Sequence, residues 1–102
     1  MKIVMVRYKV KADRAEENAD YIKKVFEELK QTNPAGLRYA SFRLEDGVSF
    51  VHFASIETDD GENPLLQIAA FKTFQEGIKE RCEEPPVVAA LDEVGSYRVF
   101  SG

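Results

Sequence analysis

The sequence has few of the features that disulfides, metal sites, cofactor sites and membrane spans require. It holds one cysteine and one histidine in 102 residues, so an internal disulfide is excluded and a zinc site would need several carboxylates. No apolar run approaches the roughly 20 residues that cross a bilayer. A glycine-rich phosphate loop, a dinucleotide fingerprint and a serine–histidine–acid set are also missing. We therefore expect no metal, no cofactor and no membrane partner.

Basic residues are also in deficit. Lys and Arg number 14 against 18 Asp and Glu, and the formal net charge is -4. The charges alternate along the chain, which makes nucleic acid and anionic membrane surfaces poor partners. The first residues alternate like a strand, unlike a targeting peptide, so we expect a soluble, cytoplasmic protein. The length predicts one domain over residues 1–102, able to bury roughly two thirds of the surface that its unfolded chain exposes.

A hairpin is predicted for residues 37–56, which read LRYASFRLEDGVSFVHFASI. Asp46-Gly47 lies between two runs of strand-forming residues and suits the positive φ values of a tight turn. Cross-strand partners share a face of the sheet. Pairing across this turn joins Leu44 to Ser49, Phe42 to Val51, Ala40 to Phe53, Arg43 to Phe50, Ser41 to His52, Tyr39 to Ala54 and Leu37 to Ile56.

The chain before the hairpin predicts a strand and a helix. Residues 3–10 alternate as a half-buried strand does. Asp13 and Glu16 have the spacing of a capping box, and a helix is expected over residues 14–30. Its apolar stripe consists of Ala15, Ala19, Ile22, Phe26 and Leu29.

The chain after the hairpin predicts a second helix and a last strand. Pro64 suits a first helical turn, and Phe71, Phe74, Ile78 and Cys82 recur at helical spacing. Close packing on the sheet would explain Gly77 within this helix. We expect the helix to end at residues 83–86, which include two prolines, and the last strand to cover residues 93–100.

The order strand, helix, strand, strand, helix, strand predicts an α+β, ferredoxin-like βαββαβ fold. One four-stranded antiparallel sheet would carry both helices on one face, with the first strand beside the third and the fourth beside the first. The other face would be bare, and a symmetric homodimer would cover it. The side chains expected there are Ile3, Met5, Leu37, Tyr39, Phe50 and Ile56.

The chain resembles the antibiotic biosynthesis monooxygenase superfamily. The resemblance rests on the opening strand KIVMVRYKV, the helix that follows, the EDG turn of the hairpin, the stretch AAFKTFQEGIKERC and the terminal GSYRVF. It implies a dimeric α+β barrel whose ligand sites lie between helices and sheet or within the barrel. Members include cofactor-free oxygenases of phenolic substrates, haem-degrading enzymes and relatives without an evident reaction.

The sequence departs from the haem-degrading members. Those use an asparagine on the first strand, a buried tryptophan and a histidine on the second helix. This chain has Arg7 on the corresponding strand, no tryptophan, and no histidine between Leu65 and Cys82. These departures argue against haem degradation, whereas tyrosine, asparagine and histidine can carry the chemistry of the phenol-oxidising members.

His52 is the candidate catalytic residue, on the sheet face that we expect to be turned from the helices. An imidazole with a pKa near neutrality can take a proton from a phenol or enol. Arg7 and Arg43 would stabilise the resulting anion, and Tyr39 and Ser41 would hold its oxygen. Alternatively, His52 is structural and bonds Ser41 or a partner chain, while the arginines pair with carboxylates.

The remaining aromatic residues and the cysteine fit the core better than a site. We expect Tyr8 and Tyr97 between sheet and helices, where a phenol fills space and finds one hydrogen bond. Cys82 is expected in the core because it continues an apolar stripe. Core positions are also predicted for Phe26, Phe42, Phe53, Phe71 and Phe74.

Two functions follow from this sequence. One is a cofactor-independent monooxygenase, or a related enzyme, acting on a small aromatic or polyketide-like molecule. The other is a non-catalytic dimeric barrel that binds a small ligand or acts through its dimer surface. An enclosed cavity lined by His52, Arg7 and Arg43 would favour the enzyme, whereas a closely packed interface with the arginines in salt bridges would favour the alternative.

Overall fold

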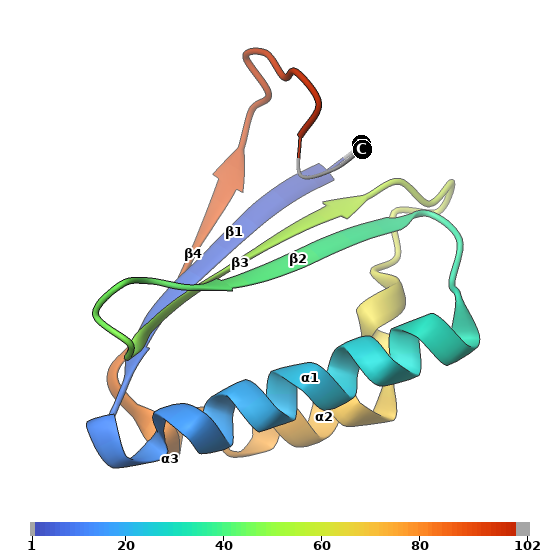
Figure 1. Ribbon diagram of the computed structural model, residues 1–102. Coiled ribbons are helices and arrows are strands. Elements are labelled where there is room, and N and C mark those ends of the chain that lie inside the picture. Colours follow the sequence, from blue (N-terminus) through green and yellow to red (C-terminus); the bar gives the residue numbers. More distant parts are fainter. Residues whose placement is uncertain (1, 100–102) are drawn as a thin grey trace.

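A computed structural model, which describes residues 2–99, shows a four-stranded antiparallel sheet with all helices on one face (Figure 1). The strand order is β2-β3-β1-β4. This arrangement confirms the ferredoxin-like α+β fold and the predicted neighbours of the first strand. The elements are β1 (Lys2–Val10), the 3-10 turn η1 (Ala12–Arg14), α1 (Ala15–Thr32), β2 (Leu37–Arg43), β3 (Ser49–Ile56), the 3-10 turn η2 (Pro64–Gln67), α2 (Ala69–Glu76), α3 (Ile78–Arg81) and β4 (Cys82–Leu91).

The β2–β3 hairpin has the predicted register. Ser41 pairs with His52 and Arg43 with Phe50, as the turn at Asp46-Gly47 requires. Gly47 has a φ of 77°, a value that glycine adopts without steric cost. The Asp46 carboxylate accepts hydrogen bonds from the backbone N–H groups of Val48 and Ser49 at 3.0 and 2.8 Å. The turn residues therefore determine which side chains meet across the strands.

The start of α1 differs from the prediction. A 3-10 turn precedes the helix, and no side chain caps it, so the capping box of Asp13 and Glu16 is wrong. The helix ends at Thr32 and is capped by Asn33, which has a φ of 44° and whose N–H donates to the Leu29 carbonyl at 2.7 Å. The buried side chains of α1 are Ala15, Asn18, Ala19 and Val25.

The last strand lies earlier than expected. β4 begins at Cys82, directly after α3, and runs through Pro85 and Pro86. Proline is tolerated there because β4 is an edge strand and its pairing with β1 shifts register between Arg7 and Lys9. The predicted strand over residues 93–100 is wrong for 93–99, which form no strand and include the exposed Tyr97. Residue 100 lies outside the described part.

The hairpin presents to the helices the face that we expected to be bare. The pairing of β3 with β1 places His52 beside Val6 and Phe50 beside Tyr8, and Val6 and Tyr8 are among the β1 residues that pack toward the helices. Strand residues alternate between the two faces of a sheet, so the residues that share a face with His52 all lie on the same side. Leu37, Tyr39, Phe50 and Ile56 therefore lie together on the helix side. Our assignment of these residues to the outer face is wrong.

The outer face of the sheet carries the alternate residues and has no helix over it in the described structure (Figure 1). Met5 lies near its middle, paired with Phe53 on one side and Ala89 on the other. Phe42 and Phe53, which we assigned to the core between sheet and helices, contact each other on this face with ring centroids 6.1 Å apart. The apolar side chains of the outer face are Ile3, Met5, Ala40, Phe42, Val51, Phe53, Val87, Ala89 and Leu91.

Candidate functional site

His52 lies in the middle of β3 and both of its ring nitrogens have hydroxyl partners. Nε2 lies 2.7 Å from the hydroxyl of Tyr8 on β1. Nδ1 lies 2.6 Å from Oγ of Ser41 and 3.0 Å from the hydroxyl of Tyr39, both on β2. The side chain is only 4 % exposed. The register of three adjacent strands thus brings three polar side chains, those of Tyr8, Tyr39 and Ser41, to one buried imidazole.

Aromatic rings hold this imidazole in place. Its ring stacks beside those of Tyr8 and Tyr39, with centroids 5.3 and 5.9 Å away and interplanar angles of 13° and 18°. Phe74 of α2 lies over it at 5.6 Å. A ring confined on several sides has one orientation, so the hydrogen-bond partners of each nitrogen are fixed as well.

A cavity of about 260 Å³ lies between the sheet and the α2 region, and His52, Tyr8 and Tyr39 form part of its wall. This volume is slightly below the usual range of ligand pockets, which begins at about 300 Å³. Most of the remaining wall is apolar, with two amides. It consists of Val4, Val6, Ala54, Asn63, Leu65, Leu66, Phe71, Phe74, Gln75, Ile78, Pro86 and Val88.

A second, larger hollow of about 540 Å³ lies between α1 and the strands β2 and β3, and we call it the α1–β2 groove. Ser41 lines it, together with Phe50 and Arg43. Since Ser41 also bonds His52, a line of hydrogen bonds joins the cavity to this groove through the imidazole.

Burial sets the charge state of the site. It lowers the pKa of His52 to about 4, below the near-neutral value that we expected, so the imidazole is uncharged near pH 7 and is a weaker base than an exposed histidine. Burial raises the pKa of Tyr39 to about 12. Burial also raises the pKa of Tyr8 well above its usual range, although the Asn18 hydrogen bond and the charge of Arg81 oppose that rise. The site is therefore an uncharged set of proton donors and acceptors at neutral pH.

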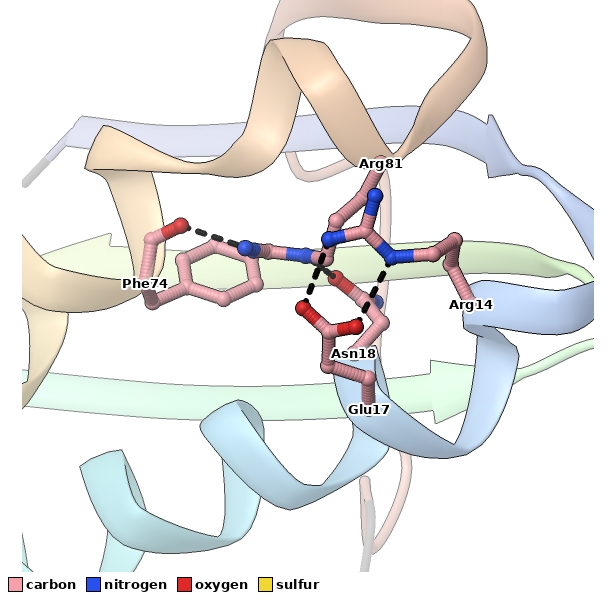
Figure 2. Close-up of polar contacts among 5 residues, drawn as sticks. All are labelled: Arg14, Glu17, Asn18, Phe74 and Arg81. Carbon is pink, nitrogen blue, oxygen red and sulfur yellow. Dashed lines mark hydrogen bonds and ion pairs between the residues drawn. The ribbon is translucent and has the colours of Figure 1, made fainter.

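The polar chain continues from Tyr8 into the helical layer. Nδ2 of Asn18, on α1, donates to the Tyr8 hydroxyl at 2.9 Å. Nε of Arg81, at the end of α3, donates to Oδ1 of Asn18 at 3.0 Å. Figure 2 shows the Arg81 guanidinium extending from α3 past Asn18 to the carbonyl of Phe74, to which Nη2 donates at 2.8 Å.

The structure brings together some of the residues predicted for the site and separates others. His52, Tyr39 and Ser41 are in contact. Arg43 lies farther along β2, where it forms an ion pair with Glu16 at 2.8 Å. Arg7 is exposed on the outer face, because its neighbours on β1 point toward the helices. The two arginines therefore do not share a pocket with His52.

Sequence reasoning missed Asn18 and Arg81 and underrated Tyr8. Tyr8 makes two hydrogen bonds where one was expected. Asn18 falls three residues after Ala15, on the buried stripe of α1, and Arg81 falls three residues after Ile78. A polar residue at an apolar position of a helix was the available signal, because such a group is buried only when it has partners.

Comparisons with known proteins identify the fold. Neither a protein-family model nor a curated protein sequence matches the chain. Among solved structures, an antibiotic biosynthesis monooxygenase superposes with a TM-score of 0.75 at 17% identity, covering 93% of this chain and 100% of that one. A variant of SnoaB, a cofactor-independent oxygenase from Streptomyces nogalater, gives 0.66 at 14% identity, with coverages of 93% and 95%. A protein of unknown function from Nitrosomonas europaea gives 0.72 at 13% identity, with coverages of 94% and 92%.

These likenesses confirm, at the level of the fold, the resemblance found in the sequence. The chain has the fold of the antibiotic biosynthesis monooxygenases. None of the helices in the described structure has the length and apolar character needed to traverse a membrane.

Proposed function

We propose that this chain, which has the fold of the antibiotic biosynthesis monooxygenases, is a cofactor-independent monooxygenase acting on a small aromatic or polyketide-like molecule. The observation that supports the proposal most directly is a neutral, buried imidazole in the wall of a largely apolar cavity. The volume of about 260 Å³ favours a substrate with one or two rings. Phe71 and Phe74 would pack against those rings.

His52 is the base in this proposal, and it acts through Tyr8. The Tyr8 oxygen can accept a phenolic proton from the substrate while its own proton passes to Nε2 of His52. Tyr8 then never has to exist as a free phenolate, which its raised pKa disfavours. Tyr39 lines the same cavity and can donate to the substrate oxygen, and Ser41 connects Nδ1 to the α1–β2 groove.

Dioxygen is the oxidant in the reaction. A deprotonated, electron-rich ring can transfer an electron to dioxygen without a cofactor, after which a carbon–oxygen bond forms. Replacement of a ring C–H by C=O converts the phenol to a quinone, one oxygen atom enters the product, and the other leaves as water. The balance closes without an external reductant, so the protein has only to bind, deprotonate and exclude bulk water.

Oxygen uptake tests the proposed reaction. Small phenols and quinols, including naphthols, are screened with an oxygen electrode, and His52→Gln is compared with the unsubstituted protein. Uptake that falls at least about 100-fold in His52→Gln, with ligand affinity retained, supports general-base catalysis, whose usual contribution is of that order. Uptake unchanged in this variant would remove His52 from the mechanism.

A non-catalytic ligand-binding protein is the second candidate. Two observations favour it. Hydroxyls of the protein itself occupy both His52 nitrogens, which is typical of a structural histidine, and Arg7 and Arg43 do not line the cavity as we expected for the enzyme. This candidate predicts binding of the same aromatic compounds to the cavity with no oxygen uptake. Fluorescence titration of 2-naphthol beside the oxygen electrode separates the two functions.

A homodimer is part of the same proposal. The outer sheet face carries exposed apolar groups such as Val87 and Leu91, with Met5 near its middle. Two such faces packed together would remove this surface from water. Light scattering of the protein should give twice the monomer mass, and Met5→Asp should give a monomer. Val94→Asp, in a fully exposed position after β4, is the control and should leave the mass unchanged.

A further inference from the structure

Arg81 is a buried cation whose side-chain hydrogen-bond partner, Asn18, carries no charge. It is 1 % exposed, and burying a charge is costly unless hydrogen bonds and other contacts compensate. Its donors reach Asn18 and the carbonyl of Phe74. The guanidinium also lies 4.5 Å from the ring centre of Tyr21, a favourable cation–π distance.

The nearby carboxylate of Glu17 is already held by another residue. Arg14 donates to it twice, from Nε at 2.7 Å and from Nη2 at 2.8 Å (Figure 2). This pair leaves the Asn18 amide as the acceptor for Nε of Arg81. The residue next to Glu17 in the sequence therefore becomes the link between a buried charge and the sheet.

Arg81 fixes the orientation of the Asn18 amide. An arginine can only donate hydrogen bonds, so the amide must turn its oxygen toward Nε. The amide nitrogen then faces Tyr8 and donates to the phenol oxygen. With the amide acting as donor, the proton of Tyr8 is free to point to its other neighbour, Nε2 of His52.

We propose that Arg81, acting through Asn18 and Tyr8, holds neutral His52 in the Nδ1–H tautomer. Nε2 accepts the Tyr8 proton, and Nδ1–H points to the oxygens of Ser41 and Tyr39, which lie on that side of the ring. Arg81 and Asn18 are positioning residues, because they act on the imidazole through Tyr8 and neither contacts it directly. The assignment stands on the hydrogen-bond geometry alone, and only its catalytic value rests on the proposed function.

The tautomer matters for the proposed proton transfer. Nε2 is the nitrogen joined to Tyr8, whose ring lines the cavity, and in this tautomer its lone pair is available to receive a proton. Nδ1–H is the group joined to Ser41 and the α1–β2 groove. In the opposite tautomer, Nε2 would already carry a proton and could not act as the base.

Nitrogen NMR of the intact protein tests the assignment directly. The sequence contains one histidine, so a two-bond proton–nitrogen correlation spectrum of the 15N-labelled protein at pH 7 reports on His52 alone. We expect Nδ1 to show the shift of a protonated nitrogen and Nε2 that of an unprotonated one. A protonated Nε2, or equal populations of the two forms, would overturn the proposal.

The relay is the series of hydrogen bonds from Arg81 through Asn18 and Tyr8 to His52. Asn18→Asp should reverse the direction of its last two hydrogen bonds with a side chain of nearly the same shape. A carboxylate accepts from both Arg81 and Tyr8, so the Tyr8 hydroxyl must donate to residue 18 and accept from His52. We expect Nε2 of His52 to become protonated in this variant. Asn33→Asp is the control, because it makes the same chemical change at an exposed position just after α1. This position lies outside the series of hydrogen bonds from Arg81 to His52, so the spectrum should be unaltered.

Removing the Tyr8 hydroxyl tests whether the effect passes through it. In a Tyr8→Phe background, changing Asn18 to Asp should no longer alter the protonation of Nε2. A change of equal size with and without the hydroxyl would mean that the substitution acts by another route, and the relay would be wrong. These spectra need no substrate, so they separate failure of the relay from failure of the proposed enzyme activity.

Discussion

Gly77 lies directly against the guanidinium of Arg81. A Cβ placed on residue 77 would be 2.6 Å from Nη1 of Arg81, closer than non-bonded atoms can approach. The glycine was expected to allow close packing on the sheet, and the structure shows instead that it leaves room for a side chain. The absence of a Cβ between α2 and α3 is therefore a requirement of the buried arginine.

Gly77→Ala should destabilise the protein, because Arg81 must leave its place or the helix ends must shift. We expect a loss of about 1–3 kcal/mol, the usual cost of inserting a methyl group into a packed interior. Urea unfolding measures it. Gly95→Ala is the control, since nothing lies within 4 Å of the Cβ position there. Equal stability of the two variants would contradict the crowding seen at Gly77.

The stability of the protein should fall between about pH 6.5 and pH 4. Burial lowers the pKa of His52 from 6.5 to about 4, so the unfolded chain takes up a proton on acidification before the folded chain does. The stability contributed by neutral His52 is therefore present above the unfolded pKa and lost as pH falls toward the folded one. The loss from this group is about 3 kcal/mol.

His52→Gln should remove that pH dependence. Glutamine keeps a donor and an acceptor but does not titrate. The unfolding free energy of the variant should therefore vary less between pH 7 and pH 4 than that of the unsubstituted protein. Unfolding in urea at several pH values compares the two proteins. An equally steep loss in both would mean that other groups cause it.

The turn carboxylate of Asp46 should act in a lower pH interval. Its hydrogen bonds with Ser49 and Val48 lower its pKa from 3.8 to about 2, so its contribution is lost as pH falls through that interval. Asp46→Asn should destabilise the hairpin at neutral pH and flatten the stability profile below pH 4. Asp59→Asn, an exposed carboxylate in the next loop, should do neither, and thermal unfolding distinguishes the variants.

Neighbouring residues of β1 should affect ligand binding in opposite ways. Val6 lines the cavity, whereas Arg7 lies on the outer face. Val6→Phe should fill part of the cavity and weaken the binding of 2-naphthol at least tenfold, while Arg7→Phe should leave the affinity unchanged. Fluorescence titration gives both values. Weakened binding in Arg7→Phe alone would place the ligand on the outer face.

Local signals in the sequence predicted the hairpin and much of the fold. The Asp46-Gly47 turn specifies which residues of β2 and β3 are opposite each other, so the sequence was enough to place Ser41 and Tyr39 near His52. The order of elements and the handedness of crossovers then gave the strand order. These features depend on neighbours in sequence and on general rules of chain connection.

The sequence did not reveal the position of β4. Two prolines beside two glutamates indicate a helix end and a loop, yet an edge strand with a register shift accommodates them. The alternating residues of 93–99 looked like a strand but have no strand partner in the described structure. Pairing partners, which local patterns do not specify, decided between the two segments.

By itself, the sequence determined the order of the elements, the register of the hairpin and the pairing of His52 with Ser41. Only the tertiary structure decided which face of the hairpin meets the helices, because both faces carry large apolar groups. All hairpin residues on one face are buried together, so a wrong assignment of the face misplaces all of them. It also decided that Arg43 and Arg7 lie away from His52, and that Asn18 and Arg81, 63 residues apart, join it through Tyr8. Such contacts depend on how distant elements pack, and a buried polar chain forms only where packing brings every partner within hydrogen-bond distance.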